Sequence, residues 1–278
     1  MWLLYSLLAA VLWGVGQIFV KKGLNKTSEL FNNVLAGLMG FTIFIPFALA
    51  HEVQFDKFWQ LLPFTCIVSA LFFSYYYAIG KGKLALTGTV IGTYPFVTVL
   101  LSFLFLGEKL SQFQFLAISL IIIGTIFVAL PDRKQKIIIG TWLFLALLAV
   151  FMLGTADFLI KLLMTQSDIY TYLFTYAFGS LIVSVIFILL DKKGRKLPPL
   201  SRKNYLATFL GVGMIETGFF VFHLAANEGL ISLVTPISGI YVAITAVLAW
   251  LILKEKIDKK HAFGITLAAL GVILVGIA

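Results

Sequence analysis

Residues 92–110 read GTYPFVTVLLSFLFLGEKL, and residues 239–257 read GIYVAITAVLAWLILKEKI. A shift of 147 positions aligns the two stretches, placing Tyr94 on Tyr241 and one Glu-Lys pair on the other. Leucine matches are expected by chance in so apolar a chain, so the shared glycine, tyrosine and Glu-Lys pair carry the argument. The pattern indicates that one unit of sequence occurs twice in this chain.

The duplication also extends to the starts of the two halves. There a shift of 140 positions aligns Gly14 with Gly154. We therefore predict two repeats, residues 1–134 and residues 135–278. Internal repeats with matching hydropathy are typical of secondary transporters, which bind their substrate between the repeats.

The composition predicts a membrane protein. The chain is 61% hydrophobic and 12% charged, whereas about 25% of the residues of a soluble domain are charged. Apolar runs of about 20 residues cross the hydrocarbon core as helices, and the period of two expected of a barrel is absent. The fold class that we predict is an all-α membrane protein with ten transmembrane helices, in the plasma (inner) membrane. The ten spans are 2–20, 31–50, 58–79, 85–106, 112–130, 138–160, 170–190, 204–226, 232–253 and 261–277.

Lysine and arginine are distributed unevenly among the connections. Of the 21 basic residues, only Lys57, Lys109 and Lys161 fall on one side of the predicted bundle. The positive-inside rule then places the other side in the cytoplasm and both termini outside. Corresponding connections of the two repeats have opposite charge bias, as expected of five-helix units inserted upside down relative to each other. Because the basic residues form no patch with interleaved aromatic residues, we expect no nucleic-acid partner.

Each repeat contains the same ordered set of short motifs. They are Ala85-Leu86-Thr87-Gly88-Thr89, Tyr94-Pro95, Leu106-Gly107-Glu108-Lys109-Leu110 and Gly124 in the first repeat, and Ser232, Tyr241, Leu253-Lys254-Glu255-Lys256-Ile257 and Gly271 in the second. Together with Trp13-Gly14, they resemble the EamA domain of the drug/metabolite transporter (DMT) superfamily. The resemblance implies two inverted five-helix repeats and a central cavity lined mainly by spans 1, 3, 4, 6, 8 and 9. It also implies movement of small organic solutes such as amino acids, other metabolites or toxic compounds.

Two features depart from the family pattern. The family's proline is Pro95 in the first repeat but Val242 in the second, where Pro236 lies six residues earlier. We therefore expect the kink in that span at another place. The better-known bacterial members of the family keep both termini in the cytoplasm, whereas the loop charges of this chain place them outside, so the sequence leaves the membrane orientation open.

Four charged or titratable residues are placed well inside the predicted spans, with Lys161 at a boundary, and all belong to the second repeat: Asp157, Lys161, Glu216 and His223. Such a residue costs about 2.5 kcal/mol or more in a bilayer and usually faces protein or water. Glu216 and His223 are two turns apart on one helix face. One hypothesis is that Glu216 and Asp157, with His223, bind a polar substrate or carry a coupling proton, since burial disfavours a charged carboxylate.

The alternative hypothesis gives these residues a structural role. Asp157 would pair with Lys161, four residues further along the same helix. Glu216 or His223 would form hydrogen bonds between helices. We also expect a structural role for the Glu-Lys pair at Glu108-Lys109, near the end of its span and close to the membrane interface.

Several aromatic and amide side chains are further candidates for the site. A tyrosine hydroxyl deep in a membrane needs a hydrogen-bond partner, which favours a cavity. Tyr76, Tyr94 and Tyr241 are the tyrosines that the repeat aligns with polar or identical residues. Trp13 and Gln17 are spaced four residues apart and share a face of the first span.

The function that we predict is secondary transport by alternating access. We expect an exporter or exchanger of small organic metabolites or drugs, with a small-molecule substrate and the lipid bilayer as its partners. Catalytic motifs and metal-binding clusters are absent from the sequence, so we expect neither an enzyme nor a cofactor. A rival is a membrane-embedded enzyme acting on lipid with Glu216 and His223 as acid and base, and a third interpretation is a flippase for lipid-linked sugars. The sequence leaves open the substrate, direction, coupling ion and choice between monomer and homodimer.

Overall fold

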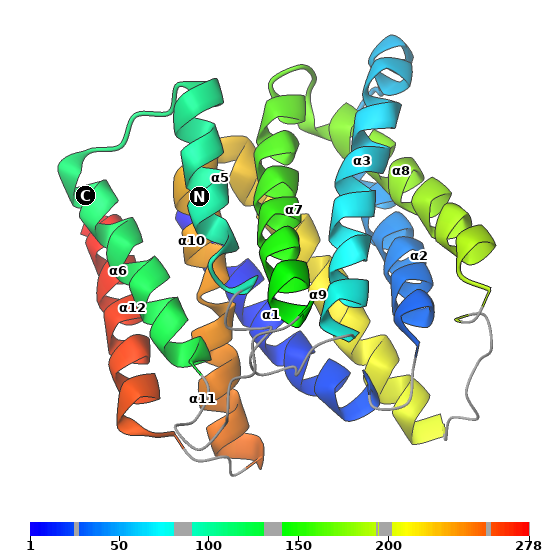
Figure 1. The fold of residues 1–278 in the computed structure, drawn as a ribbon. Helices are drawn as coiled ribbons and strands as arrows, with labels where there is room; N and C mark the ends of the chain where they lie inside the picture. Colours follow the sequence, from blue (N-terminus) through cyan, green and yellow to red (C-terminus); the bar gives the residue numbers. More distant parts are fainter. Residues whose placement is uncertain are drawn as a thin grey trace.

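The computed structural model describes residues 1–24, 28–80, 91–130, 141–192, 194, 202–253 and 257–277, and every element in these ranges is helical (Figure 1). The first half contains α1 (Trp2–Leu24), α2 (Glu29–Ala48), α3 (Phe55–Gly80), α5 (Tyr94–Leu101), the π-helical turn η1 (Ser102–Leu106) and α6 (Gln112–Ala129). The second half contains α7 (Thr141–Met164), α8 (Ile169–Leu190), α9 (Arg202–Glu228), α10 (Ile231–Gly239), α11 (Tyr241–Leu253) and α12 (Lys259–Ile277).

Eight helical stretches in the described ranges are long and apolar enough to cross a membrane. They coincide with eight of the ten predicted spans. The other two predicted spans, 58–79 and 85–106, fall on α3 and on the shorter apolar helix Tyr94–Leu106. The all-helical class with multiple apolar spans is confirmed, whereas the count of ten membrane helices stays a prediction.

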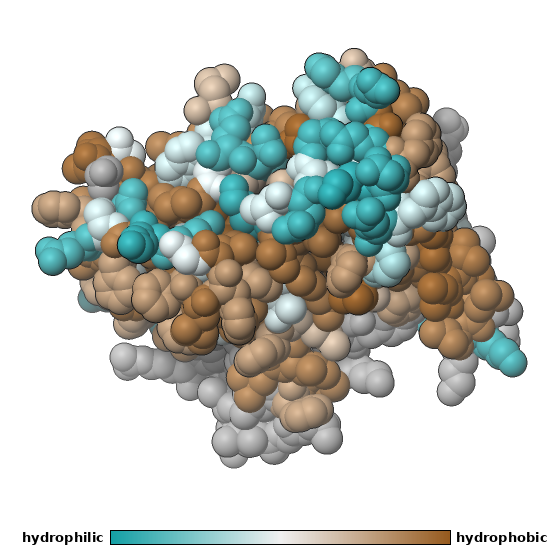
Figure 2. All heavy atoms as spheres, turned by 90° about the horizontal axis from the view of Figure 1, so that it is seen from above, coloured by the Kyte–Doolittle hydropathy of each residue, from teal (hydrophilic) through white to brown (hydrophobic). Residues whose placement is uncertain are grey.

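Hydrophobic side chains form much of the outer surface of the bundle. Five of the most exposed are phenylalanines: Phe103, Phe105, Phe115, Phe144 and Phe151. Figure 2 views one end of the bundle, where polar residues gather in a band and hydrophobic residues surround them. Exposed apolar flanks with a polar end suit a protein whose sides are covered by lipid.

The two halves pack against each other in reciprocal pairs. Helix α1 packs on α9, and its counterpart α7 packs on α3. Likewise α1 packs on α11, and α7 packs on α5, while α2 pairs with α8 and α6 pairs with α12. Each of these contacts is reproduced when the halves are exchanged, so the predicted correspondence between helices also describes how they pack.

The pair α6–α12 shows this reciprocity at single residues. A Cβ atom added to Gly124 would lie 2.6 Å from the carbonyl oxygen of Gly264, and one added to Gly271 would lie 2.6 Å from the carbonyl oxygen of Ala117. The shift of 147 makes Gly124 equivalent to Gly271, and Ala117 equivalent to Gly264. Since a later residue of α6 meets an earlier residue of α12, the two helices run in opposite directions, as Figure 1 also shows.

A second reciprocal contact fixes the first helix of each half. The Thr98 hydroxyl donates to the carbonyl oxygen of Gly154 at 3.2 Å, and the equivalent Thr245 hydroxyl lies 3.4 Å from that of Gly14. Neither glycine has room for a side chain, because an added Cβ would lie within 3 Å of side-chain atoms of the facing helix. These contacts hold α7 against α5 and α1 against α11.

In each half, a described helix begins directly after a turn at equivalent positions of the repeat. Helix α5 begins at Tyr94 after a turn at Gly92 and Thr93, and α11 begins at Tyr241 after Gly239 and a turn at Ile240. Tyr94 and Tyr241, the first residues of α5 and α11, are equivalent in the repeat. Pro236 lies inside α10. The expectation that the second repeat bends at another place was therefore wrong.

Glu108 caps a helix of the opposite half. Gly107, with φ of 66°, ends η1 in the left-handed conformation that glycine adopts readily. The next residue, Glu108, is buried, and its carboxylate accepts hydrogen bonds from the backbone N–H groups of Ile231 and Ser232, both at 3.0 Å. A carboxylate at the positive end of a helix is stabilising. The expected structural role of Glu108 therefore takes the form of a cap on α10.

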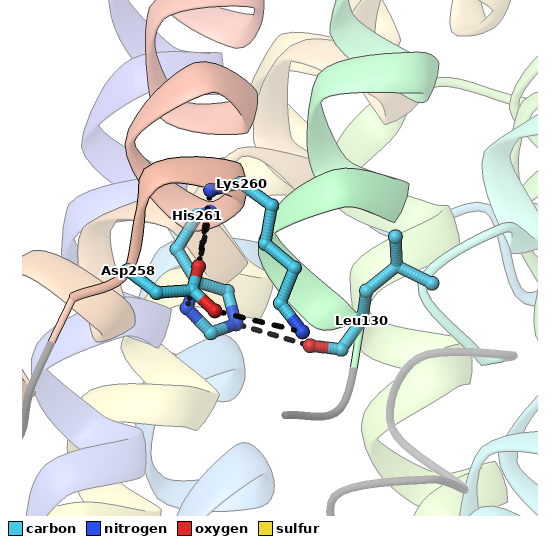
Figure 3. A network of polar contacts seen from close by, with 4 residues as sticks. All are labelled: Leu130, Asp258, Lys260 and His261. Carbon is cyan, nitrogen blue, oxygen red and sulfur yellow. Dashed lines mark hydrogen bonds and ion pairs between the residues drawn. The ribbon is translucent and has the colours of Figure 1, made fainter. Parts of the chain in front are cut away.

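A polar network joins the end of α6 to the start of α12 (Figure 3). The Asp258 carboxylate accepts hydrogen bonds from the backbone N–H groups of Lys260 and His261 at 3.1 and 3.0 Å. The His261 ring lies 3.0 Å from Asp258 on one side and 3.0 Å from the carbonyl oxygen of Leu130 on the other. Desolvation raises the pKa of the Asp258 carboxyl, but the His261 N–H and the charges of His261 and Lys260 outweigh it, so the pKa falls below its usual value.

Replacing Gly124 by alanine tests the α6–α12 contact. The added methyl group would meet backbone atoms of α12, which cannot move aside as a flexible side chain can. We expect Gly124→Ala to lower the free energy of unfolding by about 1–3 kcal/mol, measured by thermal unfolding in detergent. Gly276→Ala is the control, because its nearest neighbouring atom would lie 3.8 Å away. Equal melting temperatures for the two variants would contradict the close approach.

Replacing Glu108 by alanine tests the cap on α10. The change leaves the buried N–H groups of Ile231 and Ser232 without their acceptor. We expect a loss of about 1–3 kcal/mol of stability, measured as a lower melting temperature. Lys109→Ala is the control, because Lys109 is the next residue and is exposed. A Glu108→Ala protein as stable as this control would show that the carboxylate does not hold α10.

Candidate functional site

A cavity lies where the helices of the two halves meet. The centre of a water molecule can occupy a volume of about 80 Å³ in it, which is room for several water molecules. It is lined by α1, α3, α5, α7, α9 and α11, the spans that the family resemblance implies, and also by α2 and α8. The lining residues are Trp13, Gln17, Ala36, Phe72, Phe73, Tyr94, Leu153, Asp157, Tyr176, Ser180, Ile215, Glu216, Phe219 and Tyr241.

The lining is built largely from equivalent positions of the two halves. Ten of the fourteen residues form five such pairs. The pairs are Trp13 with Leu153, Gln17 with Asp157, Ala36 with Tyr176, Phe72 with Phe219, and Tyr94 with Tyr241. A cavity lined in this way lies at the centre of the reciprocal packing.

Six of the eight predicted site residues share this cavity: Trp13, Gln17, Tyr94, Asp157, Glu216 and Tyr241. Two are not placed in it. His223 does not line the cavity, and the side chain of Tyr76 lies outside the described part of the structure. The roles of all eight in transport stay predictions.

The two carboxyl groups of the cavity have different surroundings. Asp157 is 2% exposed, and it accepts a hydrogen bond of 2.9 Å from the Thr235 hydroxyl of α10. Glu216 is 7% exposed. Among the described residues, its carboxyl group has no hydrogen-bond or ion-pair partner. Glu216 is thus a buried acid that faces the space of the cavity.

Lys161 does not neutralise Asp157. Its Nζ atom donates hydrogen bonds to the carbonyl oxygens of Ala226 and Gly229, at 2.7 and 2.8 Å. These oxygens lie at the end of α9, where a cation complements the negative end of a helix. The alternative in which Asp157 pairs with Lys161 was therefore wrong, because the ammonium group reaches across to the neighbouring helix.

Trp13 is held rigidly at the wall of the cavity. Its indole N–H donates to the carbonyl oxygen of Ile215 at 3.1 Å. The ring meets Phe219 and Tyr241 edge to face, with centroids 5.0 and 5.8 Å apart. Gly218 allows this approach, since an added Cβ would lie 2.6 Å from the indole ring. The indole therefore presents a fixed aromatic surface to the cavity.

His223 belongs to a neighbouring aromatic cluster. It is fully buried, and its Nδ1 atom lies 2.6 Å from the carbonyl oxygen of Phe219. Its ring centroid lies 4.9 Å from that of Tyr176 and 5.6 Å from that of Tyr172. Of these residues, Tyr176 and Phe219 also line the central cavity. The structure therefore separates His223 from the space that Glu216 faces.

Helix α8 also contributes to the cavity, which was not expected from the sequence. Tyr176 and Ser180 line the cavity from this helix, four residues apart. The same spacing drew attention to Trp13 and Gln17 in the first span. The spacing of Tyr176 and Ser180 within an apolar span is the signal that could have identified them, although their equivalents in the first repeat, Ala36 and Gly40, are not polar.

The chemistry of the cavity is that of a binding site. Two carboxyl groups stand among aromatic rings, and the lining residues that the structure describes include no lysine, arginine or histidine. In the described ranges, no cluster of three or more His, Cys, Asp or Glu could hold a metal ion. The arrangement can bind a small molecule and can bind or release protons.

Comparison with known proteins agrees with this architecture. The sequence pattern of the EamA-like transporter family matches residues 1–130 and 140–277. An uncharacterised protein of Methanocaldococcus jannaschii is 31% identical over 134 residues, which cover 47% of this chain and 97% of that protein. A protein crystal structure superposes with a TM-score of 0.80 at 15% identity, covering 99% of this chain and 96% of the other. At 15% identity, this superposition shows that the two proteins share a fold and shows nothing about a shared function.

The family match covers nearly the whole chain. Its two matched segments are the two halves that contribute equivalent helices and equivalent lining residues to the cavity. This chain belongs to the EamA-like transporter family of the drug/metabolite transporter superfamily.

Proposed function

We propose that this protein is a secondary transporter that moves a small organic solute across the plasma membrane by alternating access. The observation that carries the proposal is the central cavity, to which both halves contribute equivalent residues. A site between two repeats becomes accessible from either side when one repeat rocks against the other. We infer export or exchange as the direction of transport.

The proposal includes two inverted five-helix repeats, residues 1–134 and 135–278. The antiparallel, reciprocal contact of α6 with α12 supports the inversion, because a rotation that exchanges two antiparallel helices has its axis perpendicular to them. In a membrane, such an axis lies in the plane of the bilayer. The Methanocaldococcus jannaschii relative supports the repeat length, because the 134 residues that match this chain make up nearly all of that protein.

We infer that Glu216 and Asp157 carry a coupling proton. Both are buried acids in the cavity, and no described basic side chain of the lining balances them. An acid that faces the cavity can exchange its proton with either side as access alternates. Transport of a solute is thereby linked to the proton gradient, since each acid binds a proton on one side and releases it on the other.

The two rival functions have less support. An enzyme that uses Glu216 and His223 as acid and base needs both groups at one substrate. Glu216 faces the cavity, whereas His223 lies in the adjacent aromatic cluster with Nδ1 against the Phe219 carbonyl oxygen. A flippase for lipid-linked sugars would use the same cavity for a different substrate, and no observation favours it.

Proteoliposomes test the proposed function. The vesicles are loaded with a mixture of amino acids, amines and small organic acids, and a pH gradient is imposed across the membrane. Mass spectrometry of the external solution then identifies any solute that leaves faster than from protein-free vesicles. We expect at least one such solute. Chemical conversion of a lipid or solute without any movement would favour the enzyme instead.

Glu216→Gln and Asp157→Asn test the acids in the same vesicles. Both changes keep the size of the side chain, and Asp157→Asn keeps an oxygen that can accept from Thr235, but neither product can carry a proton. We expect a loss of proton-driven transport of about tenfold or more, with unchanged protein yield. Glu52→Gln is the control, because Glu52 is an exposed carboxyl group outside the helices. Proton-driven flux at the control level in both variants would contradict the assignment.

A further inference from the structure

The charge and the walls of the cavity narrow the class of substrate. On the basis of the proposed transport function, we propose that the cavity binds a small organic cation, an ammonium or quaternary ammonium compound, between its aromatic rings and its two carboxyl groups.

The two acids have no basic partner among the described residues that line the cavity. The lining residues that the structure describes include Asp157 and Glu216 but no lysine, arginine or histidine. The nearest bases along α7 and α9 are engaged elsewhere. Lys161 donates to the carbonyl oxygens at the end of α9, and His223 lies in the aromatic cluster. A buried carboxylate is stable when it is paired with a positive charge. A cationic ligand would supply the charge that Lys161 and His223 do not bring to the cavity.

The wall of the cavity is largely aromatic. Half of the fourteen lining residues are aromatic: Trp13, Phe72, Phe73, Tyr94, Tyr176, Phe219 and Tyr241. The faces of such rings attract cations, and cages of aromatic rings are a common way to bind quaternary ammonium groups. An anion gains nothing from the same faces, because the face of the ring carries partial negative charge.

Part of this aromatic wall is already held in place by contacts within the protein. The Trp13 indole N–H is bonded to Ile215, and Trp13 and Phe72 both pack edge to face on Phe219 with centroids 5.0 Å apart. A ligand that binds such rings does not have to order them first, which lowers the cost of binding. The two acids and the fixed rings Trp13, Phe72 and Phe219 line the same cavity from α1, α3, α7 and α9, so one ligand could contact both kinds of group.

The positions of two tyrosines in the cavity favour a zwitterionic ligand over a simple cation. Tyr94 and Tyr241 are the first residues of α5 and α11, and the starts of helices attract anions. A zwitterion could place a carboxylate there. The experiment therefore compares a cation with a zwitterion and with a neutral molecule of the same shape.

Ligand binding is measured as the rise in melting temperature of the purified full-length protein in detergent, because a ligand that binds the folded state raises this temperature. The cations are choline, tetramethylammonium and N-methylpyridinium, and potassium chloride controls for ionic strength. The neutral partner of choline is 3,3-dimethyl-1-butanol, in which carbon replaces the charged nitrogen. The zwitterionic partner is glycine betaine.

We expect at least one cation to raise the melting temperature, choline to do so more than its neutral partner, and betaine to have less effect than choline. Glu216→Gln and Asp157→Asn should each raise the dissociation constant of the bound cation about tenfold or more, while Glu52→Gln should leave it unchanged. A variant is compared only if its melting temperature without ligand matches that of the parent protein. Two carboxyl variants are included so that the misfolding of one still leaves a test.

Three results would overturn the proposal. They are no shift with any of the three cations, equal shifts with choline and its neutral partner, and a larger shift with betaine than with choline. If one of these occurs while the vesicle assay shows solute movement that depends on Glu216, the cation assignment fails and the transport function stands. If the vesicle assay also shows no movement of any solute, the proposed function fails as well.

Discussion

The close contact of each half's first helix with a helix of the opposite half, α1 with α11 and α7 with α5, is the constraint on which the site depends. At Gly14 and Gly154 the absence of a side chain lets the backbone meet Tyr241 and Tyr94 of the facing helices. The neighbouring positions are then fixed. Gln17 and Asp157 each lie three residues after one of these glycines, and both line the cavity. A larger residue at either glycine would push the wall of the site outward.

The cavity combines a nearly symmetric shape with an asymmetric charge. The residue of the first half that is equivalent to Asp157 is Gln17, and the residue equivalent to Glu216 is the buried Ser69. Both acids therefore come from the second half, while the aromatic pairs Tyr94 with Tyr241 and Phe72 with Phe219 come from both. The residues that the two repeats share determine how the helices pack, and the residues that differ between the repeats give the cavity its acidic groups. The proposed coupling and the proposed cation site both rest on this difference.

Much of the architecture could be predicted because repeated sequence produces repeated contacts. The shift of 147 aligns Thr98 with Thr245, and the structure gives both hydroxyl groups the same kind of partner. The search for polar residues within apolar spans found Asp157 and Glu216, since a buried acid at these positions needs a solvated space. The inversion and the domain boundaries stay predictions that the packing supports.

Other features could not be predicted because they depend on contacts between distant helices. Helical spacing places His223 on the face of Glu216, but it does not show that α8 supplies Tyr172 and Tyr176 to enclose the ring. Spacing also suggested a pair of Asp157 with Lys161. The long lysine side chain instead reaches the carbonyl oxygens at the end of α9. Local sequence contains no information about where such an acceptor will lie.

If the two repeats are inverted, equivalent points of the two halves face opposite sides of the membrane, and this can be measured directly. Gln112 begins α6 and Lys259, its equivalent, begins α12, and both side chains are exposed. In a Cys66→Ser background, Gln112→Cys and Lys259→Cys are labelled with an impermeant maleimide in sealed vesicles of known orientation. We expect the two cysteines to be labelled from opposite sides. Labelling of both from the same side would contradict the inverted arrangement and the alternating access built on it.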